Sequence, residues 1–344
     1  MGRVVLVTGV ARTLGGALVH ELNAAPGVDR VIGVDVVPPR SDLGRAEFVR
    51  ADIRNPIIAK VIGAAEVDTV VHLSVTSAPG AGGRAAMKEL NVIGTMQLLA
   101  ACQKAPSLRR LVVKSSTAVY GASPADPALF TEGTQPKVAP RSGFAKDASE
   151  VEAYLRGFVR RRSDVDTTVL RFANILGPGI ESPVAALFRL PVIPTILGYD
   201  ARLQFLHPSD ALAVLREAAT GRHRGTYNVA GDGVLLLSQA ARRAGRPTVP
   251  VAGVAAKVAA PVLRKAVGVT LTPELIGLLT HGRVVDTTKL RTEFGYTPRY
   301  STAAAFEAFL AGASADADRP DDDPLPPAGL GLVGAGGNPG GADV

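Results

Sequence analysis

The sequence predicts an α/β protein built on a doubly wound parallel sheet. Short apolar runs rich in β-branched residues recur along the first half of the chain, and segments of helical periodicity separate them. Glycines follow the first of these runs at once, so the backbone can turn sharply from a strand into a helix. This alternation is typical of parallel strands with helices on both faces of the sheet.

Each expected strand is a continuous apolar run, because a parallel strand is buried on both faces. The strands are expected at residues 4–7, 31–34, 69–73, 111–113 and 167–170. The helices between them are expected at 14–23, 56–63, 85–104 and 143–162.

The first strand-to-helix turn carries the signal of a dinucleotide site. Thr8 and Gly9 end the strand, and Gly15 lies at the start of the helix, where small residues allow a pyrophosphate to approach the helix N-terminus. Asp35 closes the second strand about 20 residues later, as a ribose-binding carboxylate requires. Together these features predict a Rossmann-type nucleotide site, and a tight turn without a ligand is the alternative.

Composition indicates a soluble globular protein. The 344 residues are 47% hydrophobic and 20% charged, and no apolar run reaches the length of a membrane span. The first strand follows Met1 almost directly, so we expect no signal peptide and a cytoplasmic location. The single cysteine, Cys102, is expected in the core.

The net charge of +7 suits a polyanionic ligand. The basic clusters are scattered at expected helix ends and aromatic residues are few, so nucleic-acid binding is a minor alternative. The five histidines lack metal-ligand spacing, and no metal is expected.

We expect two lobes and a tail. The nucleotide-binding lobe should cover residues 1–175 and take in 203–228 as well. The substrate lobe should comprise 176–202 and 229–312, where Gly-Pro loops separate shorter elements. From residue 313 to 344 aspartates lie among prolines and glycines, which predicts disorder.

Further motifs follow in order along residues 3 to 312. They are Ala51-Asp52-Ile53, Val71-His72-Leu73, Asn91-Val92, Ser115 to Gly121, Leu170-Arg171 with Asn174, Phe205-Leu206-His207 and Asp286 to Leu290. With the glycine turn and Asp35, they resemble the extended short-chain dehydrogenases/reductases of the NAD-dependent epimerase and dehydratase family, typified by UDP-glucose 4-epimerase.

The resemblance implies NAD on the first lobe, a nucleotide-sugar substrate in the cleft, and a homodimer formed through the helices near 85–105 and 143–162. A carboxylate at Asp35 would favour NAD over NADP. The implied cofactor-binding residues are Thr8, Gly9, Arg12, Thr13, Leu14, Gly15, Asp35, Asp52, Ile53, Leu73, Asn91 and Lys146. The implied substrate-binding residues are Ser116, Thr117, Asn174, Arg202 and Arg283.

The catalytic set departs from the family at one position. Family chemistry uses a tyrosine four residues before a lysine, plus a strand-end hydroxyl; here Lys146 and Ser116 are present, but Ser142 stands at the tyrosine position. A serine is shorter than a phenol and far less acidic. Tyr120 could supply the proton carrier, although a wall of the substrate pocket is its simpler role, and water is a further alternative.

Two other positions differ from the family pattern. Arg12 replaces the middle glycine of the turn, where its guanidinium must bend away from the pyrophosphate or lie across it. Leu203 occupies the place of the family's diphosphate-binding arginine, and Arg202 is one residue out of register.

Three functions remain open from the sequence. The first is an NAD-dependent epimerase or dehydratase type of oxidoreductase acting on a nucleotide sugar. The second is an NAD-binding sensor or scaffold that has lost turnover. The third is a reductase of an apolar carbonyl compound, suggested by the apolar stretches 184–197 and 251–269.

Overall fold

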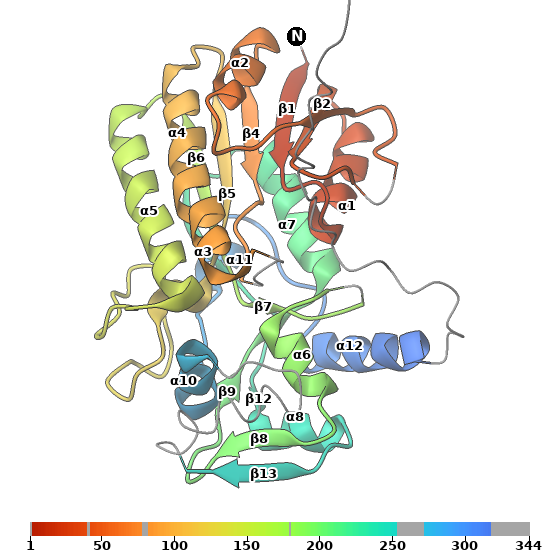
Figure 1. Cartoon of the computed structure of the whole chain (residues 1–344), viewed down its shortest axis with the longest axis vertical. Helices are drawn as coiled ribbons and strands as arrows, with labels where there is room; N and C mark the ends of the chain where they lie inside the picture. The colour runs from red at the N-terminus through yellow and green to blue at the C-terminus, as the bar shows by residue number, and fades with distance from the viewer. Residues whose placement is uncertain (1, 40–41, 78–81, 179, 253–271, 318–344) are drawn as a thin grey trace, which may run out of the picture.

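The computed structural model describes residues 2–39, 42–77, 82–178, 180–252 and 272–317. Its first lobe is a seven-stranded sheet with the strand order β11-β6-β5-β4-β1-β2-β3, and every strand pair in it is parallel (Figure 1). The strands are β1 (Arg3–Thr8), β2 (Val28–Asp35), β3 (Glu47–Arg50), β4 (Thr69–His72), β5 (Arg110–Ser116), β6 (Asp166–Phe172) and β11 (Gly225–Val229). The predicted fold class is confirmed.

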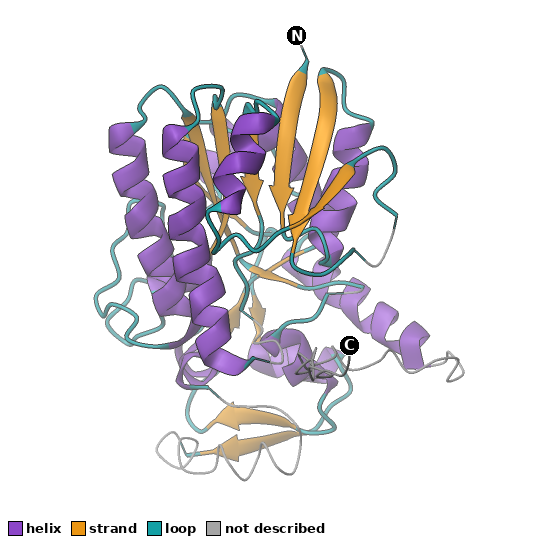
Figure 2. Cartoon of the chain, turned by 45° about the horizontal axis from the view of Figure 1, so that its top comes forward, coloured by secondary structure: helices purple, strands orange, loops and turns teal. Residues whose placement is uncertain are grey.

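Helices cover both faces of this sheet (Figure 2). One face packs against α1 (Thr13–Asn23) and α7 (Pro208–Thr220). The other packs against α2 (Ile57–Ala64), α4 (Thr95–Lys104) and α5 (Gly143–Arg161). Adjacent β5 residues show the alternation, because Val112 belongs to the first core and Val113 to the second.

The five strands expected from apolar runs are confirmed, and each is longer than its apolar run or matches it closely. The structure adds β3, whose residues are partly exposed, and β11 at the far edge. The helix expected at 85–104 is divided into α3 (Gly83–Lys88), a π-helical turn η1 (Glu89–Gly94) and α4. Helix α7 packs in the core of the seven-stranded sheet, and β11 is a strand of that sheet.

The second lobe has its own core, formed by short elements that pack below the carboxyl ends of the strands (Figure 1). These elements are α6 (Pro183–Arg189), β8 (Ile193–Ile196), β9 (Arg202–Leu203), β12 (Leu235–Leu236), α8 (Leu237–Arg243), β13 (Thr248–Val251), α10 (Pro273–His281) and α12 (Thr302–Ala317). The short strands β7 (Asn174–Ile175) and β10 (Phe205–Leu206) pair with each other, and β10 contributes Leu206 to the first core and Phe205 to the second. Helix α11 (Thr288–Thr292) contributes Leu290 to the first core.

The apolar stretch 184–197 contains most of α6 and all of β8, and most of its apolar side chains fill the core of the second lobe, whereas Leu197 is exposed. Most of the stretch 251–269 lies outside the described residues. Helix α12 continues to Ala317, past the expected lobe end at 312, and residues 318–344 lie outside the described part. None of the helices in the described ranges is long and apolar enough to cross a membrane.

The buried His72 at the end of β4 contacts two other elements, β1 and α4. His72 Nδ1 lies 2.8 Å from Thr8 Oγ1 of β1, and its Nε2 lies 2.8 Å from Thr95 Oγ1 at the start of α4. Burial, with a smaller contribution from the charge of Lys114, lowers the pKa of His72 to about 3. His72 is therefore a neutral structural residue.

This histidine predicts a pH dependence of stability. Between pH about 6.5 and 3 the unfolded chain binds a proton at His72 that the folded chain does not, so the free energy of unfolding rises with pH in this window. His72→Gln should reduce that slope by up to about 1.4 kcal/mol per pH unit. Urea unfolding at several pH values measures the slope. The exposed His20→Gln is the control, and equal slopes for wild type and His72→Gln would contradict the assignment.

Candidate active site

Two positions of the turn between β1 and α1, Gly9 and Gly15, leave no room for a Cβ atom. Gly9 has a positive φ of 81°, a conformation that favours glycine. A Cβ on Gly15 would lie 2.8 Å from the carbonyl carbon of Gly9 and closer still to its oxygen. The first turn of α1, with Thr13 and Leu14, is therefore held directly against the end of β1, and its free amides face the carboxyl edge of the sheet.

Asp35 lies at the end of the neighbouring strand β2. Its Oδ2 accepts a hydrogen bond from the Ala11 amide at 3.0 Å, and its Oδ1 accepts one from the Val36 amide at 2.7 Å. These bonds fix the carboxylate beside the glycine turn. A carboxylate can accept about four hydrogen bonds, so capacity remains for ribose hydroxyls.

Arg12 extends across the sheet edge. Its Nη1 donates to Thr76 Oγ1 at 2.5 Å, in the loop after β4. The guanidinium thus stays at the carboxyl edge, within electrostatic reach of Asp35. A cation in this position could contact the phosphates of a dinucleotide.

Other expected cofactor residues support the carboxyl edge of the sheet. The Asn91 side chain accepts from the Thr76 amide and donates to the Thr76 carbonyl, both at 2.9 Å, and so fixes the loop after β4. Leu73 is buried next to Gly9, and Thr8 is engaged with His72.

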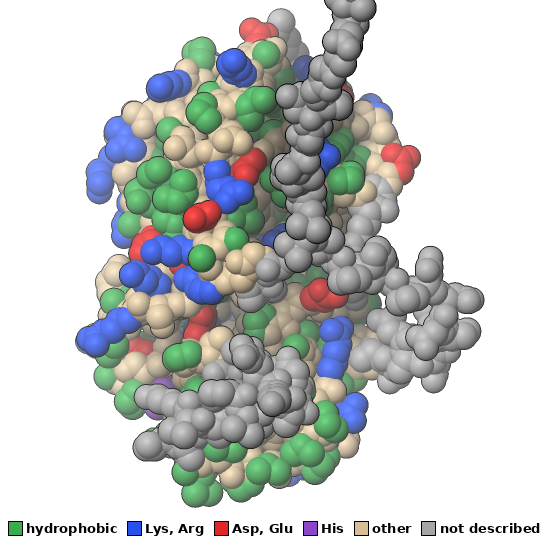
Figure 3. Space-filling view, in the orientation of Figure 1, with side chains coloured by type: hydrophobic (Ala, Val, Ile, Leu, Met, Phe, Trp, Pro, Cys, Tyr) green, Lys and Arg blue, Asp and Glu red, His purple; other side chains and the backbone are tan. Residues whose placement is uncertain are grey.

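Asp52 and Ile53 follow β3 at the same edge of the sheet. Ile53 is buried. Asp52 forms an ion pair with Arg54 at 2.6 Å, and the hydrogen bond from Arg54 lowers the pKa of the Asp52 carboxyl. Charged side chains of both signs lie side by side on the face shown in Figure 3, in keeping with pairs such as Arg54–Asp52 and Arg54–Glu89.

Ser116 and Lys146 lie on elements that pack together. Ser116 is the last residue of β5, and its Oγ accepts from the Ala118 amide at 3.1 Å, which starts the short helix η2 (Thr117–Tyr120). Helix η2 packs against α5, whose second turn begins at Lys146. The Lys146 side chain is 42% exposed and lies 3.7 Å from Glu150.

Ser142 is the residue immediately before α5 and is exposed. Its hydroxyl does not cap the helix; instead Glu274 of α10 accepts from the Phe144 amide at 3.0 Å. Burial raises the pKa of the Glu274 carboxyl, against the opposing effect of Arg283. Sequence reasoning missed Glu274, because only the three-dimensional fold brings residue 274 to residue 144.

Tyr120 is fully engaged in a buried network. Its hydroxyl donates to Asn228 Oδ1 and accepts from Arg171 Nη1, each at 2.8 Å. Arg171 is paired in turn with Glu152 of α5 at 2.6 Å. Burial raises the pKa of the Tyr120 phenol. This arrangement favours the role of a pocket wall over that of a proton carrier.

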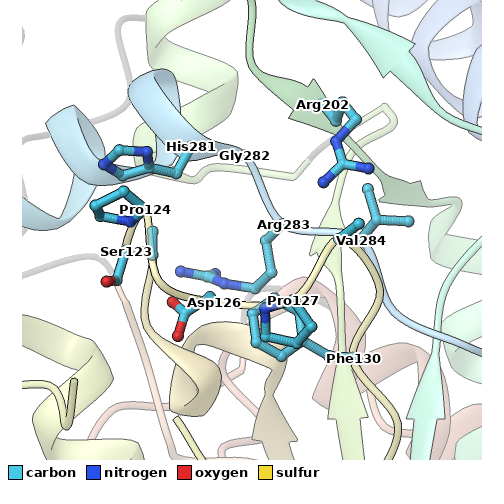
Figure 4. A pocket seen from close by; sticks show the side chains of 12 residues that line it. Ser123, Pro124, Asp126, Pro127, Phe130, Arg202, His281, Gly282, Arg283 and Val284 are labelled. Carbon is cyan, nitrogen blue, oxygen red and sulfur yellow. The ribbon is translucent and has the colours of Figure 1, made fainter. Parts of the chain in front are cut away.

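Arg202 and Arg283 line one pocket between the lobes (Figure 4). The Arg283 amide donates to the Arg202 carbonyl at 2.9 Å, and its Nε donates to the Gly121 carbonyl at 2.8 Å. Burial lowers the pKa of Arg283. His281 and Asp126 line the same pocket, and the buried Asp126 Oδ2 has no hydrogen-bond partner within the described residues. No motif in the sequence marks His281 or Asp126 as a site residue.

The alternation of side chains along β9 explains why Arg202, and not Leu203, faces the pocket. Leu203 is buried in the core of the second lobe, whereas Arg202 is exposed on the opposite side of β9 and reaches the pocket. Asn174 begins β7 and Thr117 is the buried first residue of η2, and neither of them lines this pocket. The described ranges contain no group of three or more side chains that could hold a metal ion.

The residues at the carboxyl edge fit a nicotinamide dinucleotide. A helix N-terminus without Cβ atoms in front of it accepts a pyrophosphate, and a fixed carboxylate at the end of β2 accepts ribose hydroxyls. The fold and this edge define a dinucleotide-binding protein of the Rossmann class.

Comparison with known proteins identifies the family. Residues 5–230 match the model of the NAD dependent epimerase/dehydratase family, and the chain belongs to that family. The cofactor that the sequence predicted, NAD, is therefore confirmed as the cofactor of its family. The chain is 51% identical over 316 residues to the uncharacterized protein Rv0501 of Mycobacterium tuberculosis, covering 90% of this chain and 84% of the relative.

Solved structures share the fold. MoeE5 in complex with UDP-glucuronic acid and NAD has a TM-score of 0.70 at 22% identity, covering 91% of this chain and 99% of the other. UDP-glucose 4-epimerase of Thermotoga maritima with UDP-glucose has a TM-score of 0.69 at 18% identity, covering 92% and 100%. At these identities the likeness establishes the architecture.

The glycine turn predicts the effect of one added methyl group. Gly15→Ala should abolish measurable NADH binding, or weaken it at least tenfold, because the new Cβ pushes α1 away from the Gly9 carbonyl. Gly63→Ala in α2 is the matched control, since a Cβ there has no neighbour within 4 Å. NADH fluorescence titration measures both. Equal affinities for the two variants would contradict the assignment of the groove.

Proposed function

We propose that the protein is an NAD-dependent enzyme acting on a nucleotide sugar, with UDP-glucose 4-epimerase as the nearest match in chemistry. The supporting observation is that Ser116 and Lys146 lie on two adjacent elements, next to an edge that fits a dinucleotide. The similar solved structures named above hold UDP-sugars.

In this proposal the first lobe holds the cofactor. The amides at the start of α1 and the Arg12 guanidinium bind the pyrophosphate, and Asp35 binds the adenosine ribose. The Asp35 carboxylate would repel a 2′-phosphate, which selects NAD over NADP. Bound NAD supplies an acceptor and donor of hydride for the sugar carbon.

The substrate lies between the lobes in this proposal. Arg202 and Arg283 bind its diphosphate, since guanidinium groups form charge-assisted hydrogen bonds to phosphate oxygens. Asn174 and Thr117 contact the remainder of the nucleotide sugar. The buried charge of Arg283, which its surroundings compensate only in part, supports an anionic ligand in this pocket.

The reacting hydroxyl is held by Ser116, and Lys146 supplies a positive field beside it. Ser142 is too short to replace a phenol, but its exposed position leaves room for water as the proton carrier. Tyr120 forms the pocket wall in this account. Slow turnover is therefore expected of the natural protein.

A second function is favoured by one observation. The exposed Ser142 at the start of α5 removes the general acid and base of the family. An NAD-binding sensor or scaffold would keep the cofactor groove without needing that group. The core position of residues 184–197 gives no support to an apolar-carbonyl reductase.

Restoring the phenol separates the two functions. With UDP-glucose or UDP-galactose, Ser142→Tyr should raise the rate of nicotinamide reduction about 10²-fold over wild type, the usual contribution of a placed acid and base. Ser142→Phe adds the ring without the hydroxyl and should give no gain. Absorbance of the reduced nicotinamide follows the reaction.

Slow but measurable reduction by wild type supports the enzyme. Bound NAD with no reduction across a panel of nucleotide sugars, together with turnover gained only in Ser142→Tyr, establishes the sensor or scaffold instead. No reduction by either protein contradicts a nucleotide-sugar site.

We also propose a homodimer through α4 and α5. A groove on these helices is lined by Met96, Leu99, Ala100, Gln103, Tyr154 and Arg161, and Tyr154 is 40% exposed. A second copy would bury this partly apolar surface.

Charge placed in the groove tests the dimer. Ala100 is exposed on α4, so Ala100→Glu should yield monomers without unfolding the chain. The control is Ala64→Glu at the exposed end of α2. Sedimentation velocity distinguishes the species, and a monomeric wild type or a dimeric Ala100→Glu would overturn the proposal.

A further inference from the structure

Lys114 is a lysine inside the strand that leads to the active site. It lies on β5, two residues before Ser116, so both side chains leave the same face of the sheet. Val112 shares this face and packs in the core under α1 and α7. Positions like this one in the interior of a strand are normally apolar. Lys114 belongs neither to the expected cofactor-binding residues nor to the expected catalytic residues.

The pairing register places Lys114 beside the cofactor groove. Gly9, Leu73 and Lys114 stand in one row across the sheet, directly after the paired residues of β1 and β4. Because neighbouring strands are about 4.8 Å apart, Lys114 lies roughly 10 Å from Gly9. A dinucleotide with its adenosine ribose at β2 and its pyrophosphate at β1 extends its second nucleoside over β4 and β5.

The charge of Lys114 is uncompensated. Its side chain is half-buried, and within the part of the chain that the structure describes it has no hydrogen bond or ion pair and no carboxylate that acts on its charge. Burial, with a smaller contribution from Arg12, lowers the pKa of Lys114 to about 8, so the ammonium remains mostly protonated at neutral pH. Two cations therefore face one groove, and the nearby carboxylate of Asp35 acts on Arg12.

We propose that the Lys114 ammonium makes this groove bind the reduced coenzyme more tightly than the oxidised one. The nicotinamide ring carries a positive charge when oxidised and none when reduced, whereas the pyrophosphate and both riboses are the same in the two forms. A fixed cation on β5 repels the oxidised ring and leaves the reduced ring unaffected. The proposal concerns coenzyme binding alone and is independent of the sugar substrate.

Binding measurements without substrate test the proposal. The dissociation constants of NAD and NADH are measured by calorimetry for wild type, Lys114→Met and Lys114→Arg. Wild type should prefer NADH at least tenfold. In Lys114→Met the ratio of the NAD and NADH dissociation constants should fall about tenfold, because NAD binding becomes tighter while NADH binding changes little. Lys114→Arg, and Lys104→Met at the exposed end of α4, should keep the preference.

Two results would overturn the proposal. An unchanged preference in Lys114→Met shows that the ammonium does not act on the ring. Equal weakening of both coenzymes shows that Lys114 binds a phosphate. If Lys114→Met does not fold, Lys114→Gln gives the same comparison with a polar side chain. These binding measurements need no sugar turnover. Their outcome therefore decides the role of Lys114 separately from the proposed function.

Discussion

The close packing of α1 against the end of β1 is the constraint on which the site depends. Gly9 turns the chain with a positive φ, and Gly15 allows the helix to start against the Gly9 carbonyl. This contact aims the free amides of α1 at the carboxyl edge. The Ala11 amide of the same turn binds Asp35, so the turn also fixes the carboxylate of β2. One backbone arrangement thus fixes both groups that we propose to bind the phosphates and the ribose of the cofactor.

The fold was predictable because its physical causes are local. Continuous apolar runs marked the buried strands, and the helical period marked their crossovers. The strands that the sequence analysis missed lie at the two edges of the sheet: β3 is partly exposed, and β11 has a mixed sequence. Neither shows the continuous apolar pattern. The π-helical turn at 89–94 was also missed, because its residues follow the same amphipathic period as an α-helix.

The candidate site was predictable only in part. Motif spacing indicated Gly15, Asp35, Ser116 and Lys146, since each follows a strand or opens a helix. Glu274 and Asp126 come from segments whose sequences carry no such pattern. Only the docking of the second lobe brings Glu274 to Phe144, and brings Arg202 and Arg283 to the pocket that Asp126 lines. The hydrogen bonds around Tyr120 could not be predicted from the sequence either, because Arg171, Asn228 and Tyr120 are far apart in the chain.

The central claim is that the carboxyl edge binds NAD. Calorimetric titration of the wild-type protein with NAD and with NADP tests it most directly. The account predicts one NAD site per chain, with NADP bound at least about tenfold more weakly because of Asp35. No affinity for either coenzyme would contradict it.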